Sequence, residues 1–273
     1  MKYYIRGGVG DLLQHYWFIK TYPNNEYIVH THFNQAKDIF EHLKASNYHI
    51  YQFEDLESHN DQVDVIKSEH AKEDQSNIAE TPRAYYSSFD FGDEADQKAL
   101  QAVQSFNNKQ KIIGIHPFRS GFANSVYNQF NLPAKQIPLE IVESIITDSF
   151  NYLIFGSPSE LASYGLKEKE NIKFVSFDNI LHSLSTVKHC STLIGLDSCF
   201  KSMSSMQNIN TICIIGDFPD STRDNCFINR YVNDGVMHVA KIKNIDQEAN
   251  QIIEFIKNNI KWNLSTRMLI LEM

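Results

Sequence analysis

The sequence predicts an α/β protein with two parallel β-sheets, each wound with helices. Short apolar runs alternate with segments whose apolar residues recur at helical spacing. Several of these runs end in glycine or in small polar residues, where a parallel strand would turn into the next helix. The alternation stops at residues 54–80 and restarts near residue 110. Two α/β halves are therefore the simplest architecture.

Length, composition and charge limit the classes of protein that need to be considered. The chain has 273 residues, of which 42% are hydrophobic and 21% charged, as in an ordinary globular protein. We recognise no signal peptide and no membrane-length apolar run, so we expect a cytoplasmic protein. The net charge of −8 is concentrated between Glu54 and Leu100, where 13 acidic and 4 basic residues lie. This distribution does not favour a nucleic-acid partner, although a local basic groove would be compatible with it.

The N-terminal half begins with a strand, a glycine-rich turn and an apolar-periodic helix. Its expected strands are Tyr3–Ile5, Tyr27–His32 and Tyr48–Phe53, and its expected helices are Leu12–Ile19, Phe33–Leu43 and Glu94–Phe106. The acidic segment 54–80 is expected to be a long loop or a frayed surface helix. Polar residues 107–111 are the candidate linker. We therefore place the first domain at residues 1–108.

The C-terminal half repeats the alternation of strand and helix over residues 109–261. Its expected strands are Ile112–His116, Tyr152–Phe155, Ile172–Phe174, Leu193–Leu196, Ile212–Ile215 and Met237–Ala240. Its expected helices are Pro138–Ser149, Ile180–Lys188, Phe200–Met206 and Asp246–Lys261. Residues 262–273 are expected to form a tail whose apolar end packs back on the fold or on a second subunit.

A turn that could hold a ligand follows the first strand. Gly7, Gly8 and Gly10 let the backbone turn sharply and approach a ligand closely. Their spacing does not match the dinucleotide fingerprint, because no glycine follows at the required place. Asp11 is expected at the helix start, where it either caps the helix or serves as a general base at the end of the sheet. The sequence leaves both roles open.

A second candidate turn follows the strand Leu193–Leu196. Asp197 and Ser198 lie where a parallel strand ends and a helix begins, and open α/β sheets bind ligands at such points. The free N–H groups and positive dipole of a helix start suit phosphate. The alternative is that both side chains only cap the helix. His116, at the end of its own strand, is interpreted more simply as a satisfied strand-end histidine than as a ligand group.

Five segments, taken together and in order, resemble the bacterial heptosyltransferase family, glycosyltransferase family 9. They are Gly7–Leu13, Ile113–Ser120, Ala134–Glu140, Leu153–Glu160 and Ile194–Asp217. They cover most of residues 111–217 and the first helix. The resemblance implies the GT-B fold, in which two Rossmann-like domains with parallel sheets face a central cleft. It also implies that the first domain is on the acceptor side and the second binds a nucleotide sugar.

The resemblance assigns roles to individual residues. Asp11 would be the catalytic base, and Gly7, Gly8 and Gly10 would form the acceptor-side turn. The donor and its phosphates would be bound by Arg119, Ser120, Lys135, Gly156, Ser157, Asp197, Ser198 and Lys201. For the lysines a solvated surface position is an equal alternative, whereas Arg119, directly after a strand and a proline, favours function.

The sequence departs from the family pattern at two positions of the second turn. Cys199 stands where the family has glycine, and Ser202 stands where it has histidine. Lys201, next to Ser202, is a candidate to supply the missing cation. Whether the loss of the histidine abolishes activity is open from the sequence.

The expected activity is inverting, metal-independent transfer of a sugar from a nucleotide-sugar donor to a hydroxyl acceptor, with a surface-glycan sugar favoured. No D-x-D element follows an apolar strand, and the four cysteines lack zinc spacing, so we expect no metal and no cofactor beyond the co-substrate. One alternative is transfer to hydroxymethylated DNA bases of a bacteriophage, against which the acidic segment argues mildly. Others are a non-catalytic nucleotide-sugar-binding module and a different nucleotide-binding enzyme, such as an epimerase.

Overall fold

The computed structural model describes residues 2–6, 8–31, 35–51, 89–118, 136–216, 232 and 235–271, with residues 261–271 described as backbone alone. The acidic segment 54–80 lies outside them. The chain divides into two compact units, Met1–Gly92 with Asn179–Leu181, and Asp93–Asp178 with His182–Met273. The expected boundary lay at residue 108, whereas the second unit begins at Asp93 and so includes the helix Asp93–Gln104. The mixed α/β class is confirmed.

The first unit contains a parallel sheet of order β1-β2-β3. The strands are β1 (Lys2–Arg6), β2 (Glu26–His30) and β3 (Tyr48–Tyr51), and the helices are α1 (Val9–Gln14), α2 (Tyr16–Thr21) and α3 (Ala36–His42). The helices bury Leu12, Leu13, Ile19 and Phe40 completely. Tyr16 is buried as well, and its hydroxyl donates to the backbone carbonyl of Asp90 at 2.7 Å, where the chain leaves this unit.

The second unit contains a six-stranded sheet in which every neighbouring pair is parallel. The strands are β4 (Ile112–His116), β5 (Asn151–Phe155), β6 (Ile172–Val175), β7 (Thr192–Leu196), β8 (Asn210–Gly216) and β9 (Met237–Ile242). Their order is β6-β5-β4-β7-β8-β9. Counted from β4, this is the 3-2-1-4-5-6 order of the Rossmann fold.

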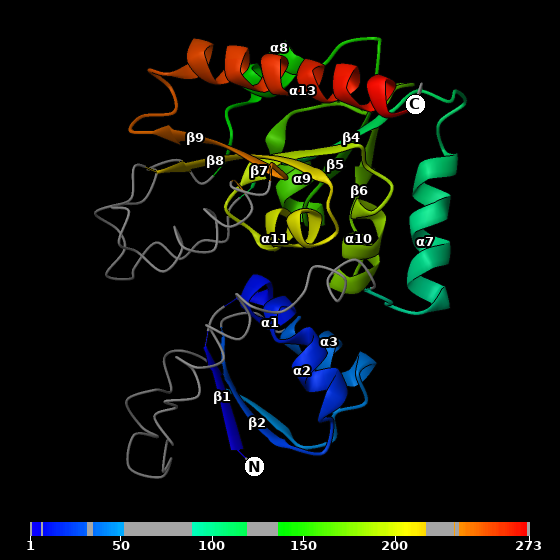
Figure 1. Ribbon diagram of the computed structural model, residues 1–273, viewed down its shortest axis with the longest axis vertical. Coiled ribbons are helices and arrows are strands. Elements are labelled where there is room, and N and C mark those ends of the chain that lie inside the picture. Colours follow the sequence, from blue (N-terminus) through cyan, green and yellow to red (C-terminus); the bar gives the residue numbers. More distant parts are fainter. Residues whose placement is uncertain are drawn as a thin grey trace. The chain divides into compact units, whose positions relative to one another are not determined.

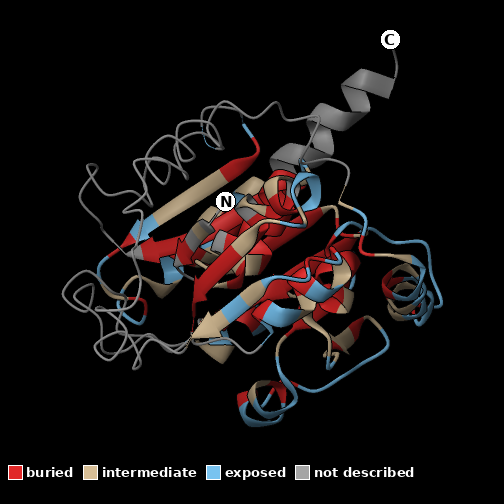
Figure 2. Cartoon of the chain, turned by 90° about the horizontal axis from the view of Figure 1, so that it is seen from below, coloured by how far each residue is buried: buried red, intermediate tan, exposed pale blue. Residues whose placement is uncertain are grey.

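Helices cover both faces of this sheet. They are α8 (Leu139–Ile145), α9 (Pro158–Tyr164), α10 (Ile180–Val187), α11 (Cys199–Met206) and α13 (Ala249–Leu271), whereas α7 (Asp93–Gln104) lies beside α10, where its Asp96 accepts the Ser185 hydroxyl. Figure 1 shows α8 and α13 on one face and α10 and α11 on the other. Figure 2 shows that buried residues gather along the strands. β4, β5 and β7 are buried at every position, which explains why their sequences are continuous apolar runs rather than alternating ones.

Four helices differ from their sequence-based prediction. The helix expected over Leu12–Ile19 is broken at His15, whose N–H bonds three residues back to Leu12 and tightens the turn. Helix α8 ends at Ile145 rather than Ser149, because the Tyr152 hydroxyl donates to the Ile145 carbonyl and accepts the Thr147 N–H. Helix α9 was not predicted. Helix α13 continues to Leu271, through the segment expected to be a tail.

Candidate functional site

The strand order places one candidate site at the carboxyl end of the six-stranded sheet, where its strands finish. From β4 the chain builds outward through β5 and β6 and then crosses to β7 on the other side of β4. Ligands of open α/β sheets bind outside the carboxyl ends of the two strands that flank such a switch point. His116 is the last residue of β4, and Asp197 and Ser198 directly follow β7. The fold therefore brings these three residues to the predicted location.

A hydrogen bond joins the ends of β4 and β7. His116 Nδ1 lies 3.1 Å from Ser198 Oγ. Ser198 is the N-cap of α11, and its Oγ also accepts the backbone N–H of Lys201 at 3.5 Å. Gly195 is the register partner of His116, and a Cβ there would lie 2.7 Å from the His116 carbonyl oxygen. Glycine at position 195 thus permits the close strand approach beneath this contact.

Aromatic rings fix the orientation of His116. Its ring stacks on Phe200 with centroids 4.3 Å apart and 29° between planes, and it meets Phe118 edge-on at 6.1 Å. The residue is 8% exposed, and burial lowers the pKa of His116 to about 3. The ring is therefore neutral at physiological pH and suits hydrogen bonding rather than charge–charge contact with a ligand. A glycine inside a strand often marks a close approach of another backbone, so Gly195 was the sequence signal that could have pointed to its partner His116.

Asp197 and Lys201 form an ion pair across the first turn of α11. Lys201 Nζ lies 2.5 Å from Asp197 Oδ1, and the exposed fractions of the two side chains are 7% and 38%. The pair is neutral in sum, so in this arrangement it adds no net positive charge for a diphosphate. Lys201 would have to exchange Asp197 for a ligand to serve as the cation expected from the sequence.

The two positions that depart from the family pattern also lie on α11. Burial raises the pKa of the Cys199 thiol to about 12, which makes it unreactive at neutral pH. Ser202 is buried, and its hydroxyl donates to the Ser198 carbonyl at 3.4 Å. Ser202 therefore stabilises the first turn of the helix in place of the ligand contact that a histidine could make.

The turn after β5 contains two further residues predicted to bind the donor. A Cβ at Gly156 would lie 2.6 Å from the Phe118 ring, so the absence of a side chain allows close packing. Ser157 is the N-cap of α9 in a capping box: its Oγ accepts the Glu160 N–H, and the Glu160 carboxylate accepts the Ser157 N–H at 2.8 Å. Ser157 Oγ also lies 2.8 Å from Glu160 Oε2. Its hydroxyl proton is thus already engaged within the turn.

The remaining predicted residues belong to the first unit or are not described. Gly8 precedes α1, Gly10 lies within it, and Asp11 is its third residue, so Asp11 is in the first turn rather than at the cap. The side chain of Asp11, together with Gly7, Arg119, Ser120 and Lys135, lies outside the described residues.

The sequence analysis did not single out one histidine of the first unit. His30 ends β2, is 2% exposed and stacks on Tyr51 with ring centroids 5.3 Å apart. It lies at the carboxyl end of a parallel sheet, as His116 does in the second unit. A histidine that ends a buried strand was the signal available for both.

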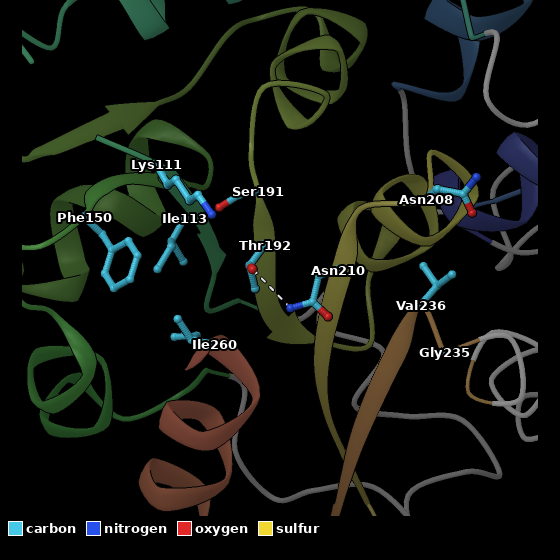
Figure 3. A pocket seen from close by; sticks show the side chains of 10 residues that line it. All are labelled: Lys111, Ile113, Phe150, Ser191, Thr192, Asn208, Asn210, Gly235, Val236 and Ile260. Carbon is cyan, nitrogen blue, oxygen red and sulfur yellow. Dashed lines mark hydrogen bonds between the residues drawn. The ribbon is translucent and has the colours of Figure 1, made fainter. Parts of the chain in front are cut away.

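A small pocket lies at the opposite, amino end of the six-stranded sheet (Figure 3). It has a volume of about 100 Å³, and its polar lining residues are Lys111, Ser191, Thr192, Asn208 and Asn210. Asn210 Nδ2 donates to Thr192 Oγ1 at 3.1 Å. This pocket is not at the end of the sheet that the Rossmann rule assigns to ligands.

Within the described ranges, no group of three or more His, Cys, Asp or Glu residues is placed to hold a metal ion. None of the helices described is both long enough and apolar enough to cross a membrane. The first finding leaves the expected metal independence a prediction.

Comparison with known proteins shows the fold. No protein-family model matches the chain, and neither does any curated protein. The structure is similar to the E. coli ADP-heptose LPS heptosyltransferase II, with 12% identity, 98% of this chain and 100% of that chain covered, and a TM-score of 0.56. It is also similar to a family 9 glycosyl transferase from Veillonella parvula, with 12% identity, 94% and 96% covered, and a TM-score of 0.52. The resemblance seen in the sequence is thus confirmed as a likeness of fold, and the chain has the GT-B-like α/β fold of these heptosyltransferase structures.

Proposed function

We propose that the chain is a glycosyltransferase that moves a sugar from a nucleotide-sugar donor to a hydroxyl acceptor, with a surface-glycan sugar favoured. The observation that carries the proposal is the hydrogen-bonded pair His116 and Ser198 at the switch point of a heptosyltransferase-like fold. Hydroxyl and backbone N–H donors at a helix start suit the diphosphate of such a donor. Asp197, which is partly exposed beside this pair, is the residue we propose to contact its sugar or ribose hydroxyls.

The proposed reaction is direct displacement with inversion. Asp11 takes the proton of the acceptor hydroxyl while the acceptor oxygen bonds to the anomeric carbon. The bond from that carbon to the diphosphate oxygen breaks at the same time, and the electron pair leaves with the nucleoside diphosphate. Hydrogen-bond donors of the second unit, with Arg119 and Lys135 as further candidates, stabilise the negative charge of the departing diphosphate without a metal. The resemblance supports these roles for Asp11, Arg119 and Lys135.

A thermal-shift screen of nucleotides and nucleotide sugars tests the proposal. A ligand that binds the native state raises the melting temperature by mass action. We expect one nucleotide sugar and its nucleoside diphosphate to stabilise the chain, and turnover with that donor to require an acceptor and to survive EDTA. An absence of stabilisation by the whole panel would contradict the proposal.

Replacing Asp11 by Asn separates chemistry from binding. We expect turnover to fall by roughly 10²-fold or more, because no carboxylate takes the proton, while stabilisation by the donor persists. Asp93→Asn is the matched control, since Asp93 is an exposed carboxylate in the first turn of α7. Unchanged turnover in Asp11→Asn would remove Asp11 from the mechanism.

A non-catalytic nucleotide-sugar-binding module is the second candidate. The observation that favours it is Ser202, whose hydroxyl is engaged with the Ser198 carbonyl where the family has a histidine. Such a module would be stabilised by the donor, yet it would not transfer the sugar to any acceptor of a glycan panel. Product analysis by mass spectrometry distinguishes the two candidates.

A further inference from the structure

The position of one proton in the contact between His116 and Ser198 decides what Ser198 can offer a ligand. A neutral imidazole carries a single N–H, on either Nδ1 or Nε2. With the proton on Nδ1, His116 donates to Ser198 Oγ. With the proton on Nε2, the Ser198 hydroxyl donates to Nδ1 instead. Both arrangements fit the 3.1 Å distance between the two atoms.

The two arrangements leave Ser198 with opposite properties. Its Oγ already accepts the Lys201 N–H. When His116 donates as well, both lone pairs of the oxygen are occupied and the hydroxyl proton is free for a ligand. When Ser198 donates to the ring, its proton is used and a lone pair is left. A free proton attracts an anion such as a phosphate, whereas a free lone pair repels it.

The surroundings of His116 hold the ring in place and uncharged. Stacking on Phe200 and the edge contact with Phe118 restrict its rotation, and the parallel pairing of β4 with β7 keeps His116 in register with Gly195. Because burial lowers the pKa of His116 to about 3, the ring carries one proton and not two at neutral pH. Beside Ser198, the charged side chains of Asp197 and Lys201 form an ion pair with each other.

We propose that His116 is a positioning residue that carries its proton on Nδ1 and thereby directs the Ser198 hydroxyl proton toward the phosphate groups of the donor. The inference rests on the proposed function, because it takes the ligand at Ser198 to be an anion. His116 holds its proton throughout and transfers it to no other group. A histidine interpreted from the sequence as a satisfied strand end thus determines the polarity of the site.

Nitrogen NMR of the full chain with labelled histidine tests the tautomer directly, and His116→Asn identifies the signal of His116. We expect a protonated Nδ1 and an unprotonated Nε2, unchanged from roughly pH 5.5 to pH 8. A ring protonated on Nε2 would overturn the proposal. This measurement needs no ligand, so its outcome is independent of whether the donor screen succeeds.

Calorimetric titration with ADP, UDP, GDP and CDP measures the consequence for binding. We expect Ser198→Ala to weaken the binding of the best nucleotide about tenfold, because a hydrogen bond to a charged group is lost. His116→Leu should weaken it at least about threefold, and His116→Asn, whose amide N–H can replace Nδ1–H, should restore most of the loss. Thr192→Val, at the other end of β7, is the matched control and should bind like the wild type.

Two results of the titration are distinguishable. If His116→Leu folds and binds as tightly as the wild type, the proposal is overturned. If the wild type binds none of the four nucleotides, the proposed function fails instead, and the tautomer measurement still decides the state of His116.

Discussion

The two ends of the six-stranded sheet contain polar side chains of similar kinds but arrange them differently. At the amino end, Thr192 and Asn210 bond to each other beside a small pocket and are 4% and 8% exposed. At the carboxyl end, Ser198 and Asp197 are held by His116 and Lys201 but are themselves partly exposed. The two ends therefore differ in accessibility: the polar side chains at the carboxyl end are oriented and can still be reached by a ligand, whereas Thr192 and Asn210 at the amino end are buried against each other. Strand β7 contributes to both ends, so substitutions along it compare the two directly.

The largest expected effect is the pH dependence conferred by His116. Its folded-state pKa of about 3 lies below the ordinary 6.5, so the unfolded chain binds the proton more tightly. The contribution to stability is full above pH 6.5 and is lost as the pH falls toward 3, by about 5 kcal/mol in total. Urea unfolding at a series of pH values should show a steeper acid loss for the wild type than for His116→Asn. Equal slopes would show that burial does not keep His116 neutral.

The second effect is an asymmetry within the ion pair. Asp197→Asn leaves the ammonium group of Lys201, only 7% exposed, without its carboxylate and should cost about 3 kcal/mol of unfolding free energy. Lys201→Met leaves Asp197, which is 38% exposed and can be hydrated, so we expect a change within about 1 kcal/mol. Equilibrium unfolding in urea measures both variants. A larger loss of unfolding free energy in Lys201→Met than in Asp197→Asn would contradict the expectation that the more buried of the two side chains depends more on the pair.

The sequence predicted the strands of the carboxyl-end site well, because full burial on both faces leaves a continuous apolar run. The runs at Ile112–His116 and Leu193–Leu196 match β4 and β7 closely. Helix α9 could have been found from its signature, since Ser157, Pro158 and Glu160 form a capping box with proline at the first helical position.

Other features depend on contacts that no local pattern encodes. Helix α8 ends early because of Tyr152, which comes from the following strand. The pattern of Phe200, Met203 and Met206 indicates one buried face for α11, whereas all residues from Phe200 to Met206 are buried. Its polar residues are buried because their side chains find partners, as when the Ser204 and Ser205 hydroxyls donate to the Lys201 carbonyl. The burial of Lys201 therefore could not be predicted from the sequence.

A smaller effect is expected at the amino end. Thr192→Val removes the acceptor of the Asn210 amide and leaves a buried donor unsatisfied, which should cost about 1–2 kcal/mol. Adding Asn210→Leu should recover part of this loss, because the unsatisfied Asn210 amide is then removed. Both variants should keep the wild-type stabilisation by the nucleotide sugar in a thermal-shift assay. If the nucleotide sugar no longer raised the melting temperature of Thr192→Val, the amino end would take part in binding, and the proposed difference between the two ends would be wrong.

The smallest effect concerns Ser157, the serine cap of α9. Ser157 has its hydroxyl engaged with Glu160 in a capping box, whereas Ser198 bonds to His116. Ser157→Ala should therefore cost about 1 kcal/mol of unfolding free energy through the loss of the cap on α9. Ser163→Ala is the control, because that hydroxyl only returns to the Glu160 carbonyl within the same helix, and it should change stability by less than about 0.5 kcal/mol. Equal losses in the two variants would show that the capping box adds nothing specific to stability. Nucleotide titration of Ser157→Ala measures separately the predicted contact of Ser157 with the nucleotide-sugar donor.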